Sequence, residues 1–177
     1  NISGTGRVKG KPLTLSAGLH SAAEGTRRLD SLALSVADTR VTGDLALAAD
    51  ALMTGQVGID SPDLSALAPL VLVDLRGQLS ANVALAPQNG KQTAKASIKS
   101  TNLAVAGNSI ASADVDATIN DLLGAPRIDG RFAAKGLKAA AATVASVDGT
   151  AKSDGNVTAF TVKADGSFEG TLATLNV

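Results

Sequence analysis

The sequence predicts an all-β protein, and two observations support this prediction. Apolar and polar residues alternate with a period of two along most of the 177 residues, as they do in half-buried strands. Clusters of Gly, Asn, Asp and Pro interrupt the alternation at short intervals, which is typical of turns. One short segment has the features of a helix. A sandwich, a barrel or a solenoid-like sheet would each satisfy this pattern.

The composition excludes several classes of function. The 16 basic and 16 acidic residues cancel, and no aromatic residues accompany the basic pair Arg27-Arg28, so the chain lacks the features of a nucleic-acid-binding surface. The chain has no cysteine, which excludes disulfides and thiolate metal sites. Hydrophobic residues make up 45% but aromatic residues only 2%, so aliphatic side chains must supply nearly all of any buried surface.

The expected strands follow one another from end to end of the chain. In the first half, every second residue is apolar or glycine along 13–19, 32–36, 41–47 and 73–85. In the second half, the alternation continues along 94–98, 103–105, 113–119, 128–134, 160–164 and 168–172. Turn residues lie at 88–90, 107–108, 124–126, 153–156 and 164–166.

A short helix is expected at 62–68. Ser61 can cap its first turn, Pro62 suits the first helical position, and Asp63 favours the positive end of the helix dipole. Pro69 would end the helix. We expect this helix to cover an end or an edge of the sheet, where unpaired strand backbone would otherwise invite aggregation.

The sequence gives little support for a catalytic site or a metal-binding site. His20 is the only histidine, and its place at the end of a strand favours an exposed residue over a member of a catalytic triad. Asp60 with Asp63 and Asp114 with Asp116 are the closest candidates for a calcium site. The second pair has the spacing of a solvated strand face. We therefore predict no enzyme activity, no cofactor and no metal site.

The apolar strand faces are together too large to remain in water, and burying them is the main driving force for folding. Two closures are compatible with the residues. Two sheets could pack face to face about 10 Å apart, with side chains filling the interior. Alternatively, one sheet could curl into a trough whose aliphatic interior stays available to an apolar ligand. The scarcity of aromatic residues and the abundance of Ala mildly favour a lining without bulky side chains, but the composition as a whole favours the filled sandwich.

Several segments together resemble the TamB-like proteins of the AsmA-like group, which are large envelope proteins of Gram-negative bacteria. The resemblance spans roughly residues 27–175 and rests on DLSALAPL at 63–70, VDLRGQLSA at 73–81 and TNLAVAGNSI at 101–110, with 113–121, 124–126, 128–130, 147–151 and 168–172. The chain begins at Asn1 in a strand-like pattern without an initiator Met, and it contains a weak internal repeat. We expect residues 1–177 to be one β-rich segment of a longer repetitive protein.

The resemblance implies a taco-shaped sheet with a hydrophobic groove, in the periplasmic body of a parent protein anchored in the inner membrane. It implies passive phospholipid transport between the inner and outer membranes, with a link to outer-membrane protein assembly. The implied partners are phospholipid acyl chains, an outer-membrane TamA-like barrel reached through the parent protein, and unfolded outer-membrane proteins. The expected groove lining consists of Leu34, Leu45, Leu47, Val73, Leu75, Leu79, Val83, Leu85, Ile98, Val115, Ile119, Phe132, Phe160 and Val162.

Two other functions remain open from the sequence. The chain could be a chaperone-like β-scaffold that offers strand edges to unfolded outer-membrane proteins or autotransporters. It could also be a structural β-repeat with a closed core, in which the same fourteen residues form the packing.

Overall fold

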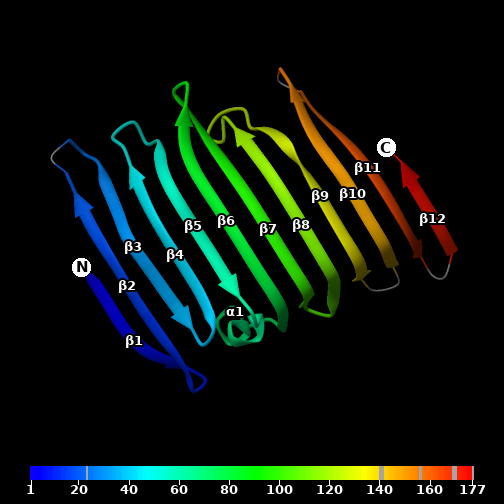
Figure 1. The fold of residues 1–177 in the computed structure, drawn as a ribbon, viewed down its shortest axis with the longest axis horizontal. Coiled ribbons are helices and arrows are strands. Elements are labelled where there is room, and N and C mark those ends of the chain that lie inside the picture. Colours follow the sequence, from blue (N-terminus) through cyan, green and yellow to red (C-terminus); the bar gives the residue numbers. More distant parts are fainter. Residues whose placement is uncertain (23, 140–141, 156, 169–170, 177) are drawn as a thin grey trace.

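The computed structural model describes the whole chain except residues 23, 140–141, 156, 169–170 and 177. Twelve strands form one open antiparallel sheet in the order of the sequence (Figure 1). They are β1 (Ile2–Val8), β2 (Lys11–Ser21), β3 (Arg27–Val36), β4 (Thr39–Leu47), β5 (Met53–Ser61), β6 (Leu75–Gln88), β7 (Lys91–Val105), β8 (Asn108–Asn120), β9 (Arg127–Ala139), β10 (Ala142–Asp154), β11 (Val157–Phe168) and β12 (Thr171–Asn176). The prediction of an all-β fold is confirmed.

The face-to-face sandwich is wrong, because every described strand belongs to the same sheet and none forms a second layer. The accessible surface shows the same result. It amounts to 11042 Å². A compact monomer of 17.5 kDa would expose about 7,900 Å². The excess arises because a single layer leaves both faces of the sheet open to solvent.

Tight turns join many neighbouring strands and fix their register. Both residues have positive φ in the turns Lys9-Gly10, Asn89-Gly90 and Ala106-Gly107, with values between 45° and 84°. This backbone is that of the type I′ hairpin turn, whose twist matches that of the strands it joins. The predicted turn at 88–90 is therefore confirmed. Of the predicted turn at 153–156, residue 156 lies outside the described residues.

The predicted turn at 164–166 is wrong. These residues lie inside β11, where Ala164 pairs with Val147 and Gly166 pairs with Val144 of β10. Gly166 does not bend the chain here. A Cβ at this glycine would lie 2.6 Å from the carbonyl oxygen of Thr143, so its role is to allow close approach of the two backbones.

The helical segment differs in detail from the prediction. It begins with a 3-10 turn, η1 (Leu64–Ala66), and continues as a four-residue helix, α1 (Ala68–Val71). Pro69 lies at the start of α1 and does not end it. Asp63 is the cap, because its carboxylate accepts a hydrogen bond from the backbone N–H of Ser65 at 2.9 Å. The predicted cap, Ser61, is the last residue of β5.

Candidate functional site

The strand register brings the apolar residues into continuous rows that run across the strands. The central apolar row contains one residue from each strand between β2 and β11. Its members, in order of pairing, are Leu15, Leu34, Val41, Ile59, Ala81, Ile98, Val115, Phe132, Gly149 and Val162. At about 4.8 Å per strand, this row is about 43 Å long.

Two further rows lie on the same face, both on the side of the central row away from η1. The second apolar row consists of Leu32, Gly43, Val57, Val83, Ala96, Ala117, Gly130, Ala151 and Phe160. The third consists of Leu19, Leu29, Leu45, Gly55, Leu85, Ala94, Ile119 and Ile128. What we call the apolar face consists of these three rows and of the residues that alternate in phase with them on the same strands.

Alternation and register place all but one of the predicted lining residues on the apolar face. Most of them are half-buried, but Leu47 is 37% exposed and Phe160 is 55% exposed. The exception is Val73, which lies in the connection before β6 and in no strand. These side chains are partly exposed for two reasons. Neighbouring side chains of the same sheet shield their flanks, but no second layer of the described chain covers their tips.

Several apolar-face residues were missing from the predicted lining. Leu15, Val41, Val57 and Ile59 belong to the central and second rows, although they lie in the first strands of the chain. The period-two signal was present at Leu15 and Val41. What the sequence could not supply was the register that aligns them with the later strands.

A helical segment closes one end of the apolar face. Leu64 of η1 is 4% exposed, and Val36 at the end of β3 is 2% exposed. Thr39 and Ser61, at the adjoining ends of β4 and β5, are 2% and 1% exposed, and their hydroxyl oxygens lie 2.6 Å apart. The expectation that the helix covers an end of the sheet is therefore confirmed.

The opposite face of the sheet is charged, and some of its charges are paired across the strands. Arg131 of β9 donates hydrogen bonds to the carboxylate of Asp116 on β8, the shorter at 2.8 Å. Lys99 of β7 lies 3.6 Å from the carboxylate of Asp114. The hydrogen bond from Arg131 lowers the pKa of Asp116, and the same bond raises the pKa of Arg131. Asp114 and Asp116 thus neutralise cations on neighbouring strands.

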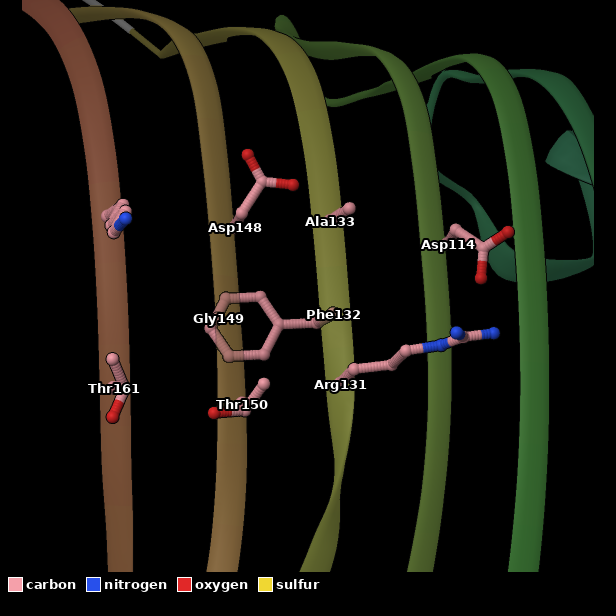
Figure 2. A pocket seen from close by; sticks show the side chains of 9 residues that line it. Asp114, Arg131, Phe132, Ala133, Asp148, Gly149, Thr150 and Thr161 are labelled. Carbon is pink, nitrogen blue, oxygen red and sulfur yellow. The ribbon is translucent and has the colours of Figure 1, made fainter.

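Shallow hollows lie on this charged face. The one in Figure 2 measures about 510 Å³ and is bordered by Asp114, Arg131 and Asp148, with Ala133 between the two aspartates. It forms because alanine lies between long charged side chains. Phe132 and Gly149 also border this hollow, although alternation along β9 places the Phe132 ring on the apolar face. The ring lies over Gly149 of β10, where a Cβ would collide with it.

The residues considered for catalysis or metal binding lie in different parts of the fold. The His20 ring lies 3.5 Å from the carboxylate of Asp30 at an exposed strand end. Asp63 caps η1, and the hydrogen bond from the Ser65 hydroxyl lowers its pKa. Among the residues that the structure describes, no three His, Cys, Asp or Glu side chains form a group that could hold a metal ion.

The fold and the site define this chain as an open, single-layer antiparallel sheet with one apolar and one charged face. Comparison with family models, with curated proteins and with solved structures finds no match. Among the helices in the described ranges, none has the length and apolar character needed to cross a membrane.

Proposed function

We propose that this chain is a periplasmic segment of a bridge between the inner and outer membranes, and that its apolar face conducts phospholipids passively. The observation that carries the proposal is the central apolar row. It continues across ten strands without a polar side chain, and no second layer of the described chain covers it.

The chemistry of the apolar face suits acyl chains. Burying a CH₂ group contributes about 0.8 kcal/mol, so a surface of uniform aliphatic residues binds by area. Leu34, Ile98 and Val115 offer no hydrogen-bonding groups that would hold a ligand in one place. A lipid could therefore move along the rows without a large barrier, while its head group stays in water.

The location and the partners of the bridge rest on the resemblance to TamB-like proteins. On that basis we propose a periplasmic parent protein with an inner-membrane anchor, an outer-membrane TamA-like partner and a role in outer-membrane protein assembly. The fold is compatible with such a bridge, because an open sheet can be extended by further strands at β1 and at β12.

A second candidate function is a β-scaffold for unfolded outer-membrane proteins, and the edge strand β1 favours it. Six of its seven residues are exposed, and it contains only one charged residue, Arg7. A strand without Pro, bulge or inward-pointing charge is open to addition of another strand.

Two neighbouring residues of β6 provide a matched test of the lipid proposal. Val83 lies on the apolar face, whereas Asn82 is exposed on the charged face. We expect the purified chain to bind fluorescent phospholipid on a native gel. Val83→Asp should weaken binding by about tenfold or more, equivalent to about 1.4 kcal/mol. Asn82→Asp adds the same charge on the other face and should bind like the unchanged chain.

Circular dichroism must show that both variants remain folded. If the folded, unchanged chain binds no phospholipid, the lipid proposal is wrong. Equal loss of binding in Val83→Asp and Asn82→Asp would also contradict it, because lipid would then not distinguish the two faces.

A further inference from the structure

The apolar face over β2–β5 has two unlike ends. At one end, Val36, Thr39, Ser61 and Leu64 are at most 4% exposed, because η1 closes that end. Figure 1 shows the β2–β3 and β4–β5 turns at the opposite end of these strands from α1. At this opposite end the apolar side chains are open to solvent.

The open end contains a hollow of about 420 Å³. Its lining includes Leu19, Arg27, Leu29, Leu45, Leu47 and Met53, which alternation and register place on the apolar face. Leu19 is 56% exposed here. The hollow is therefore an apolar depression that solvent, or an apolar chain, can reach.

Arg27 reaches the apolar face because of a bulge in β3. Between Leu29 and Leu32 the register with β4 shifts, and Ser31 takes a positive φ of 52°. The backbone N–H of Ser31 donates to the carboxylate of Asp44 at 2.7 Å, which holds the bulge. Without the extra residue, alternation from Leu32 would place Arg27 on the charged face.

Arg27 and its neighbour Arg28 differ in their partners. Arg28 lies 3.6 Å from the carboxylate of Asp30, which also lies 3.5 Å from the His20 ring. Within the described part of the chain, no carboxylate lies within 4.0 Å of the Arg27 guanidinium. Arg27 thus places a positive charge beside leucines without a carboxylate to neutralise it.

Two other acidic residues lie in the neighbouring turns. Asp50 accepts a hydrogen bond from the backbone N–H of Leu52 at 3.1 Å, so its carboxylate is engaged in its own turn. Glu24 is exposed in the β2–β3 connection. Neither one is paired with Arg27.

We propose that this end of the sheet is a docking site for an amphiphile with a phosphate head group, held by Arg27, whose acyl chain lies along β3 and β4. A guanidinium can donate two parallel hydrogen bonds to a phosphate, which favours Arg at such a position. This inference rests on the proposed function. It adds the residue that holds the phosphate and the end of the sheet at which the lipid enters.

The length of the strip agrees with this occupant. From Leu47 to Thr39 the apolar strip along β4 extends about 27 Å at about 3.4 Å per residue. One acyl chain spans half of a bilayer core, or about 15 Å. The chain can therefore lie between Arg27 and the end closed by η1, and Gly43 in the middle of β4 adds no side chain to obstruct it.

The test compares two amphiphiles with the same tail. Dodecyl phosphate carries the charged head, dodecyl maltoside carries an uncharged one, and both are titrated below their micelle concentrations by calorimetry. Arg27→Gln should weaken binding of dodecyl phosphate about fivefold to tenfold and leave dodecyl maltoside unchanged. Arg27→Lys should restore part of the affinity. Arg40→Gln removes the same charge on the charged face of β4, outside the hollow, and should change neither.

The outcomes separate this inference from the proposed function. If neither amphiphile binds the unchanged chain, both fail. If both bind and Arg27→Gln does not discriminate between them, the head-group site is wrong while the apolar face remains a lipid surface. Binding of inorganic phosphate as tight as that of dodecyl phosphate would overturn the site for an amphiphile, because the tail would then contribute nothing.

Discussion

The side-chain amide of Gln92 pairs with the main chain of Met53 as a neighbouring strand would. Its Oε1 accepts a hydrogen bond from the Met53 N–H at 2.6 Å, and its Nε2 donates to the Met53 carbonyl at 3.0 Å. The pairing of β5 with β6 ends at Gly55 and Leu85, so Met53 lies opposite Pro87, which has no N–H. Gln92 of β7 is the strand partner of Pro87, and its side chain extends across Pro87 to reach Met53. Gln92 is only 1% exposed.

Replacing this residue with leucine should destabilise the sheet. Gln92→Leu keeps the approximate size but leaves the N–H and the carbonyl of Met53 without partners, which should lower the free energy of unfolding by about 2–3 kcal/mol. Urea unfolding followed by circular dichroism measures the change. Gln88→Leu, at an exposed position beside the same hairpin, should stay within about 0.5 kcal/mol. Equal stability of the two variants would show that the amide bridge contributes nothing.

Close approach of β8 and β9 depends on Gly130. A Cβ at this position would collide with the carbonyl oxygen of Asp116 and lie 2.8 Å from the Cα of Ala117. Because backbone atoms cannot move aside easily, Gly130→Ala should lower the free energy of unfolding by about 1–3 kcal/mol. At Gly4 a Cβ would meet nothing within 4 Å, so Gly4→Ala should have little effect. A neutral Gly130→Ala would contradict the register given for these strands.

The ion pair of Asp116 and Arg131 predicts a pH dependence. Because the pKa of Asp116 is lowered in the folded chain, the pair stabilises the fold above the unfolded carboxyl's pKa, about 3.9. This stabilisation is lost as the pH falls through the lowered value. A double-mutant cycle with Asp116→Asn and Arg131→Gln should show a small favourable coupling at pH 7 that decreases as the pH is lowered towards 2 and in about 1 M salt. Coupling that changes neither with pH nor with salt would exclude an electrostatic origin.

The open edge of β1 predicts self-association of the chain. Strand addition at this edge should make the sedimentation coefficient rise with protein concentration. Gly4→Lys places a charge at the edge where nothing obstructs it, and it should reduce the association. Thr42→Lys adds the same charge at an exposed position of β4, which is not an edge strand, and it should not reduce the association. A chain that stays monomeric at all concentrations would argue against strand addition at β1.

Local alternation was sufficient to predict the strands and most of the apolar face. Leu34, Leu45, Val83 and Val115 share a face because the period of a strand is two, whatever its neighbours are. The number of layers could not be predicted this way. A strand with one apolar face looks the same in a sandwich and in a single open sheet.

The errors arose where distant residues decide the local structure. Ser61 fits the pattern of a helix cap, but the hydroxyl of Thr39 holds it in β5. Gly166 fits a turn, but its pairing with Val144 keeps it in β11. Arg27 looks like an ordinary solvated residue until the bulge at Ser31 places it on the apolar face.

Adjacent labels on β7 test the central claim, lipid binding by the apolar face, most directly. The chain contains no cysteine, so Ile98→Cys and Lys99→Cys can each carry a single environment-sensitive fluorophore. Ile98 belongs to the central apolar row, and Lys99 is exposed on the charged face. With added phospholipid, we expect the emission to shift to shorter wavelength at position 98 and to stay unchanged at position 99. A shift at position 99 alone, or at neither position, would contradict lipid binding on the apolar face.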